Sequence, residues 1–497
     1  MRRMRLVRSL LSVCLLATSA GVAAEKPNIL WFIVDDMSAH LSCYGETTIK
    51  TPAIDSLAAE GTKFERAFIT APVCSPCRSA LITGMYQTTI GAHHHRSGRG
   101  ELKIHLPEGV EPVPALFKNA GYYTCIGSGV KNVKLNAKGK RKSGGLGKTD
   151  YNFEWPKEMY DSHDWAGRAE GQPFFMQVQL AGGKHRGQNG DLAPDKVREL
   201  GSSTSPSDVK LPAHYPDDPV IRKDWAAYLD SVRYTDLEVG RVLARLNEEN
   251  LLENTVIFFM TDHGISHARG KQFLYDEGMH VPLIIKGPGI KAGAVRDDLV
   301  SSIDLAPVSL ALAGIPIPKT MQGKDILAAD YVTRGEVFAA RDRCDETTER
   351  IRAVRTVEWK YIRNFHPDRP ALQPNAYKDG KAIVKRLREL NAAGQLSENH
   401  KKLLFAETRP KEELYRITDD PSELHNVVDD PQFAEVLAEM RGALAEWIAT
   451  TGDKGEQPEG AMYDSDMALY LAEKKGTHLE ELRANIAQMK KWAAEGK

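Results

Sequence analysis

The chain has 497 residues, of which 66 are basic and 67 acidic, and 42% of its residues are hydrophobic. This near-neutral balance argues against a nucleic-acid partner that is held by bulk charge. The length is sufficient for one large domain and a smaller one, with a substantial core.

The first 24 residues have the pattern of a secretory signal peptide. Four arginines precede a short apolar stretch at 10–17, and small residues stand at 22–24. That stretch is too short to span a bilayer, and the later sequence has no apolar run of eighteen residues. We therefore expect an exported protein, periplasmic or secreted, without membrane insertion.

Three apolar runs of strand length each end in a polar cluster, as strands buried on both faces do. Helical patterns lie between them at 51–60 and 224–249. The alternation predicts an α/β fold with a large mixed, mostly parallel sheet flanked by helices, in which ligands bind beyond the carboxyl ends of the strands. The runs and their clusters are 28–34 with Asp35-Asp36, 174–180 with Lys184-His185, and 256–260 with Asp262-His263.

A short helix is predicted after Cys74, with Ser75 as N-cap, Pro76 at the first helical position and Gly84 as the stop. Cys74 then lies where backbone N–H groups converge and the helix dipole favours an anion. The Arg78 guanidinium follows one turn later. An anionic substrate is the expected ligand.

The pair Cys74 and Cys77 also forms a Cys-X-X-Cys pattern, which thiol redox proteins and zinc sites share. A structural zinc site needs two further soft ligands, whereas Cys43, Cys125 and Cys344 are isolated. A thioredoxin-like module is several times shorter than this chain. Five cysteines remain after the leader, so at least one thiol is left unpaired in a compartment that permits disulfides.

Carboxylates at two strand ends would repel one another or stay expensively desolvated unless a cation joins them. We therefore expect a divalent metal near Asp35, Asp36, Asp262 and His263.

The segment from Cys74 to Arg78 resembles the Cys-X-Pro-X-Arg signature of the type I, formylglycine-dependent sulfatases of the alkaline phosphatase superfamily. Residues 81–84 supply the Leu-X-Thr-Gly that usually follows. The resemblance, which extends over about residues 26–430, implies sulfate hydrolysis and conversion of Cys74 to formylglycine by a maturation enzyme. It also implies a catalytic domain at 25–345, a small α+β domain with an antiparallel sheet at 346–450, and a helical tail at 451–497.

The same resemblance implies a calcium ion bound by Asp35, Asp36, Asp262 and the converted Cys74. His263 stands where the family has asparagine. Because imidazole nitrogen is a softer ligand than an amide oxygen, the identity of the metal stays open.

Two lysines carry over from the family as sulfate ligands. Lys271 precedes a Tyr-acid-Gly turn, and Lys148 follows a glycine as the family's first active-site lysine does, with Lys131 as the other candidate. Asp150 stands where the family has a histidine. The run that ends in His95 could supply a replacement.

The leaving group and the substrate involve further residues. By resemblance, His185 assists the leaving group as an acid. The segment 341–346 resembles sulfatases close to heparan N-sulfatase and bacterial polysaccharide sulfatases, which implies a sulfated glycan. The candidate substrate-binding residues are His95, Lys184, His267, Arg343, Asp345 and Glu346.

Besides the thiol redox protein considered above, two alternatives outside the sulfatases remain at this point. A phosphate or phosphonate ester hydrolase of the same superfamily uses a similar metal site, and a silent carbohydrate-binding module could share the fold. Residues 351–364 predict a small antiparallel sheet, and the charge-rich stretch 378–402 predicts a solvated helical excursion.

Overall fold

The computed structural model describes residues 26–130, 146–457, 459–473 and 475–497. The expected signal peptide and Lys131 therefore lie outside the described residues. Within the described part, no helix is long and apolar enough to cross a bilayer.

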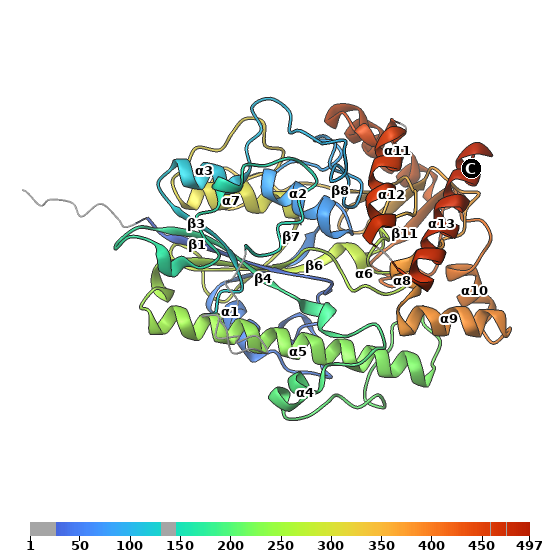
Figure 1. The fold of residues 1–497 in the computed structure, drawn as a ribbon, viewed down its shortest axis with the longest axis horizontal. Helices are drawn as coiled ribbons and strands as arrows, with labels where there is room; N and C mark the ends of the chain where they lie inside the picture. Colours follow the sequence, from blue (N-terminus) through green and yellow to red (C-terminus); the bar gives the residue numbers. More distant parts are fainter. Residues whose placement is uncertain (1–25, 131–145, 458, 474) are drawn as a thin grey trace, which may run out of the picture.

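A seven-stranded sheet forms the centre of the molecule, with helices on both faces (Figure 1). Only β6 runs against the direction of the other strands, so the expected large, mostly parallel sheet is confirmed. In spatial order the strands are β3 (Tyr123–Gly127), β4 (Phe174–Leu180), β1 (Asn28–Val34), β5 (Thr255–Thr261), β6 (His280–Lys286), β2 (Thr62–Phe68) and β7 (Ala294–Ser301).

The apolar run of β1 is continuous because both faces of the sheet are covered. Trp31 and Ile33 pack in one core with α2 (Cys74–Thr83), α3 (Val113–Asn119) and α7 (Leu305–Leu312). Leu30 and Phe32 face the opposite core, which α1 (Pro52–Glu60) and α5 (Pro219–Glu248) cover. The polar clusters that follow the strands emerge between these two layers.

A second sheet, with four antiparallel strands, lies on the right in Figure 1. The expected small sheet is confirmed, and its first strand precedes residue 346. Helix α11 (Ala434–Thr451) packs on this sheet, and the tail folds back as α12 (Ala461–Glu473) and α13 (Thr477–Ala494). Its strands are β8 (Val337–Arg341), β9 (Ile351–Arg355), β10 (Trp359–Asn364) and β11 (Glu412–Arg416).

The stretch 378–402 differs from its prediction. It forms helices, but Lys378 and Lys381 are buried rather than solvated. Lys378 Nζ donates to the carbonyl oxygens of His267 and Lys271, at 2.7 and 2.6 Å, so its ammonium group forms hydrogen bonds inside the protein instead of with solvent. The remaining short helices are α4 (Pro194–Leu200), α6 (Asp276–Met279), α8 (Ala376–Asp379), α9 (Ala382–Ala392) and α10 (Glu398–Leu404).

Candidate active site

Cys74 is the first residue of α2, two positions earlier than the sequence predicted. Val73 is the N-cap, while Ser75 lies inside the first turn and its Oγ accepts a hydrogen bond from the Arg96 backbone. Gly84 ends the helix in a left-handed conformation, as predicted (φ 64°). The earlier start brings Cys74 itself to the positive end of the helix dipole.

The Cys74 sulfur is buried beside two lysine ammonium groups and an imidazole. Lys271 Nζ lies 3.0 Å from Sγ, His263 Nε2 3.1 Å and Lys184 Nζ 3.7 Å. Burial opposes ionisation of the thiol, but the nearby lysines outweigh it and hold the pKa of Cys74 well below its ordinary value. The surroundings of position 74 therefore favour a negatively charged group.

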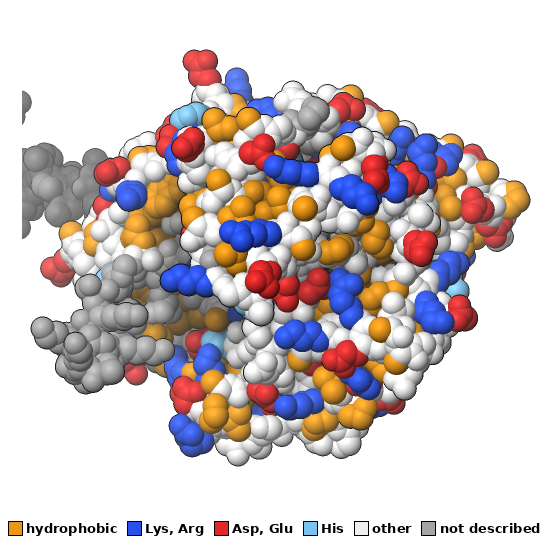
Figure 2. Space-filling model, turned by 45° about the vertical axis from the view of Figure 1, so that its right-hand side comes forward, with side chains coloured by type: hydrophobic (Ala, Val, Ile, Leu, Met, Phe, Trp, Pro, Cys, Tyr) orange, Lys and Arg blue, Asp and Glu red, His pale blue; other side chains and the backbone are white. Residues whose placement is uncertain are grey.

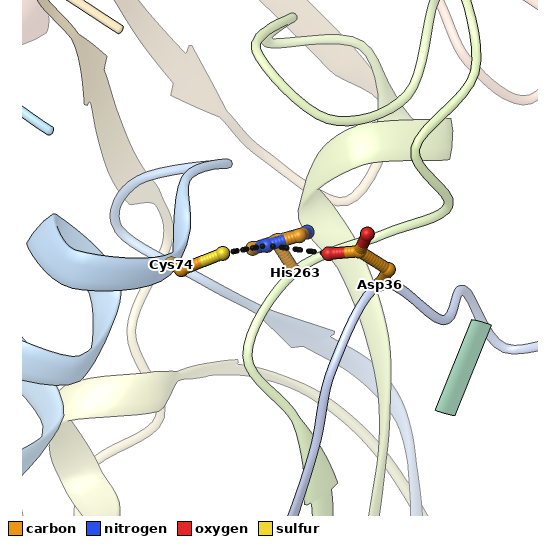
Figure 3. A group of neighbouring side chains, drawn as sticks. All are labelled: Asp36, Cys74 and His263. Atoms are coloured by element: carbon orange, nitrogen blue, oxygen red, sulfur yellow. Dashed lines mark hydrogen bonds and ion pairs between the residues drawn. The ribbon is translucent and has the colours of Figure 1, made fainter. Parts of the chain in front are cut away.

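The polar pairs after β1 and β5 meet because the two strands are parallel neighbours, with Val34 opposite Thr261. Asp36 takes a left-handed conformation (φ 54°). Its Oδ1 lies 3.3 Å from His263 Nε2, which stands between Asp36 and Cys74 (Figure 3). Residues from two strand ends and a helix start thus converge at one point.

The residues that converge here present donor atoms that fit a metal ion. His263 Nδ1 lies 2.9 Å from the Gly264 carbonyl, which can only accept, so Nδ1 carries a proton and Nε2 of the neutral ring has a lone pair. That lone pair faces Asp36 Oδ1, Asp262 Oδ1 at 3.4 Å and the Cys74 sulfur. Electron-pair donors gathered in this way fit a divalent cation.

Arg78 ties the carboxylates together from the next turn of α2. Its Nε donates to Asp262 Oδ2 at 2.9 Å, and its two other nitrogens donate to Asp35 and Gln179. Burial raises the pKa of Asp262. At Asp35 the cations, Arg78 first, outweigh burial and hold the pKa well below its usual range.

Two further lysines contact Asp35. Lys148 Nζ lies 3.0 and 3.1 Å from its two carboxylate oxygens, and Lys184 Nζ 2.6 Å from Oδ2. Lys184 can approach because Gly183 precedes it. A Cβ on Gly183 would stand 2.1 Å from the Asp36 carbonyl oxygen, so a larger residue would push the turn away from β1.

The structure gives His185 other partners than those the sequence implied. Its Nε2 lies 2.9 Å from Glu238 Oε2, and Lys196 Nζ donates to its Nδ1. Both ring nitrogens of His185 are thus engaged within the chain, and its role at the leaving group stays a prediction.

Two residues that were expected to bind substrate, His267 and Arg343, form hydrogen-bonded pairs within the chain. His267 Nε2 binds Asp224 at 2.6 Å, and its ring stacks on Trp225. The guanidinium of Arg343 is buried and donates to Glu459 and Asp466 from the tail. These pairs could not be predicted from the sequence, because each one joins segments that lie far apart in the chain.

The remaining expected residues lie beside the cluster. Asp345 and Glu346 line a cavity of about 380 Å³ with Tyr377. Burial and the neighbouring Asp345 raise the pKa of Glu346 to about 7. His95 Nδ1 lies 3.0 Å from Asp345 Oδ1.

Two further residues, Tyr377 and Gln179, contact the site and were not predicted from the sequence. Tyr377 OH donates to Asp36 Oδ2 at 3.4 Å, and the Lys271 ammonium lies 5.1 Å from its ring centroid. Gln179 belongs to β4, and its position one residue before the strand end was the available signal. Tyr377 lies far beyond the matched motifs, so no local pattern marked it.

A second cavity, of about 990 Å³, lies on the other side of Arg96 and is lined by Arg99, Lys103 and Lys148. The face in Figure 2 intersperses lysine and arginine with acidic side chains. Attraction of an anion therefore comes from the local lysines and arginines rather than from the charge of the whole chain.

The cysteines do not form the redox or zinc arrangements considered above. All five described cysteines are free, and Cys77 is buried in the core, where burial raises its pKa well above the ordinary value. Among the described residues, the groups that could hold a metal include Cys74 but not Cys77. Cys77 is therefore a packing residue rather than a resolving thiol.

Comparison with known proteins identifies relatives along most of the chain. The family model Sulfatase matches residues 27–315, and N-sulphoglucosamine sulphohydrolase, C-terminal, matches 263–369. An ulvan-active sulfatase of Formosa agariphila is 31% identical over 88% of this chain and 77% of its own. Human N-sulphoglucosamine sulphohydrolase is 27% identical over 88% and 93% of the two chains. A solved 2-O GAG sulfatase has a TM-score of 0.62 at 19% identity, over 88% and 96%.

Proposed function

The chain belongs to the sulfatase family and is a sulfate ester hydrolase, and from that premise we propose that it removes sulfate from a sulfated glycan with a formylglycine formed at Cys74. We also propose that it is exported, and that a maturation enzyme converts the cysteine. The observation that supports this most is the position of the Cys74 sulfur. It lies at a helix N-terminus between a buried lysine and a set of metal donors.

A sulfate ester is slow to hydrolyse because its negative charge repels nucleophiles. Lys271 and Lys184 lie beside position 74 and would bind the sulfate oxygens, which neutralises that charge as it develops. Arg78 holds Asp35 and Asp262 in place. Because Lys271 and Arg78 are buried, their contacts to charged groups are strong.

Asp35, Asp36, Asp262 and His263 would hold the metal. The family resemblance and the carboxylates favour calcium, and the imidazole is its least typical ligand. A bound divalent ion would supply positive charge that stabilises an oxygen nucleophile at position 74. Lys148, which now binds Asp35, would be free to contact sulfate once that ion satisfies the carboxylate.

The glycan assignment is supported by the two cavities beside the site and by the names of the relatives. The cavities share Arg96, and basic side chains line the larger one, which suits a polyanionic chain. The relatives include an ulvan-active sulfatase and an N-sulphoglucosamine sulphohydrolase.

The test is to produce the protein with and without a formylglycine-generating enzyme. Peptide mapping should find an aldehyde at position 74 only after coexpression, together with release of sulfate from ulvan or heparan fragments. Equal activity of the cysteine form would refute the proposal. Faster cleavage of a phosphonate monoester than of any sulfate ester would favour the alternative hydrolase.

A further inference from the structure

The cavity of about 990 Å³ beside the site is rich in basic side chains, and we call it the basic cavity. Its volume lies at the upper end of the range of about 300–1,000 Å³ that is typical of small-molecule sites. It therefore has room for a sugar unit beyond the one that carries the cleaved sulfate. Its charged lining residues are the basic Arg96, Arg99, Lys103, Lys148 and Lys157 and the acidic Asp150 and Glu154.

Both acidic residues of the basic cavity already have partners. Asp150 Oδ1 accepts a hydrogen bond from Arg99 at 2.7 Å, and a carboxylate oxygen of Glu154 lies 3.4 Å from His105 Nδ1. Lys103, in contrast, is exposed and makes no ion pair in the described part of the chain. Its Nζ donates to the Arg99 carbonyl oxygen at 3.3 Å. Positive charge is therefore left over in this cavity for a ligand.

One wall of the basic cavity is aromatic. Trp155 lines the cavity and is half-buried. It makes T-shaped contacts with the buried rings of Tyr151 and Tyr160, at centroid distances of 5.8 and 6.0 Å, and these hold the indole in one orientation. A fixed indole that is partly open offers an apolar surface on which the C–H face of a sugar ring can pack. The cavity thus combines the two features that suit an anionic sugar.

The basic cavity adjoins the reacting position. A carboxylate oxygen of Asp150, which lines the cavity, lies within 4.8 Å of the Cys74 sulfur. Arg96, which also lines it, donates from its backbone N–H to Ser75 Oγ at 2.8 Å. A glycan whose sulfate lies at position 74 can therefore extend directly into this cavity.

The loop 98–103, which carries two of the basic side chains, is held by α12 of the tail. The backbone N–H of Gly98 donates to Asp466 Oδ1 at 3.1 Å. The backbone N–H of Leu102 donates to Ser465 Oγ at 3.2 Å. Because these contacts restrain the loop before a ligand arrives, less ordering is required on binding.

We propose that the basic cavity is a subsite for the sugar unit next to the one that carries the cleaved sulfate, and that this neighbouring unit is anionic. The inference rests on the proposed function. Trp155 packs on the ring of that unit, and Lys103 and Arg96 bind its carboxylate or its own sulfate. These residues make the protein prefer glycan fragments of at least two units over a single sulfated sugar.

Binding to Cys74→Ala protein tests the subsite, because this variant lacks the proposed nucleophile and leaves a bound glycan intact. The affinities are measured by calorimetry in a calcium-containing buffer. One set of probes is a sulfated glucosamine and heparan disaccharides whose neighbouring uronate carries a 2-O-sulfate, lacks it, or has its carboxyl group reduced to an alcohol. Ulvan fragments of one and two units form a second set.

A disaccharide with a charged neighbouring unit should bind about 10-fold more tightly than the single sugar, as one charge-assisted contact provides. Loss of this gain on removal of the 2-O-sulfate, or on reduction of the carboxyl group, identifies which anion is bound. Lys103→Gln should reduce the gain to about twofold, and Trp155→Leu should weaken disaccharide binding about 3- to 10-fold.

Two matched control variants should leave the affinities unchanged. Lys50→Gln replaces an exposed lysine directly before α1, on the other face of the large sheet. Trp359→Leu replaces a half-buried tryptophan of β10 in the second sheet.

The same gain in Lys103→Gln and Lys50→Gln would overturn the subsite. Equal affinity for one and two units in both sets of probes would also overturn it. Because Lys103 is exposed, its replacement leaves the fold intact. A disaccharide preference that Lys103→Gln and Trp155→Leu remove, in a protein that releases no sulfate after maturation, would support the subsite and locate the failure in the proposed function instead.

Discussion

Replacing Lys271 by methionine removes one buried charge while keeping the length of the side chain. Lys271 Nζ lies 3.0 Å from Cys74 Sγ and 3.2 Å from Asp36 Oδ1, and the residue is 3% exposed. Two unit charges 3.0 Å apart interact by about 5 kcal/mol at an effective dielectric of about 20. Neighbouring cations also stabilise an anion at this position. We therefore expect the variant to lose about 3 kcal/mol of transition-state stabilisation, the value typical of a single charge-stabilising group.

That loss corresponds to a fall in kcat/KM of about 100- to 1,000-fold. The assay is sulfate release by Lys271→Met of verified aldehyde content, with Lys286→Met, a lysine paired with Glu60 away from the site, as the control. In unconverted protein the same change should raise the pKa of the Cys74 thiol and slow its alkylation at neutral pH. A kcat/KM within about threefold of the wild type, with unchanged alkylation, would refute the reasoning.

Four other outcomes follow from contacts in and beside the site. Cys74→Ala should abolish sulfate release with little change in melting temperature, since alanine suits a helix start. Asp262→Asn should lower the bound divalent metal measured by elemental analysis, and Lys148→Ala should lower kcat/KM by about 100-fold. Burial favours the neutral form of Asp224, but its partners, the Arg186 guanidinium first, outweigh burial and lower the pKa of this carboxyl to about 2. The ionised carboxylate therefore stabilises the fold above about pH 4, and this stabilisation is lost as the pH falls toward 2. Asp224→Asn should therefore lower the free energy of unfolding at neutral pH by about 2 kcal/mol in urea titrations.

The strands and their polar ends were predictable because their signals are local. The run 28–34 is apolar at every position, since both of its faces are buried, and Asp35 follows it directly. The start of the helix at Cys74 was predicted within two residues. Its exact start depended on Val73 taking the cap, and the preference of serine for that position did not decide it.

Side-chain pairing across the chain could not be predicted. Lys378 appeared to belong to a solvated charged stretch, yet it donates to two carbonyl groups more than a hundred residues away. Arg343 sits in a segment typical of substrate contact, but the acids of the tail neutralise it. Composition and periodicity carry no information about which distant group meets such a charge.

The sheet, the signature helix and the carboxylates that follow the strands could be read from the chain alone, because apolar periodicity and motif spacing act over a few residues. Folding between remote segments chose the partners of the histidines around position 74. It paired His185 with Glu238, and His95 with Asp345, which also accepts a hydrogen bond from Tyr470 of the tail. The physical reason is that hydrogen-bond partners of buried groups are fixed by packing between remote segments, which only the folded chain brings together.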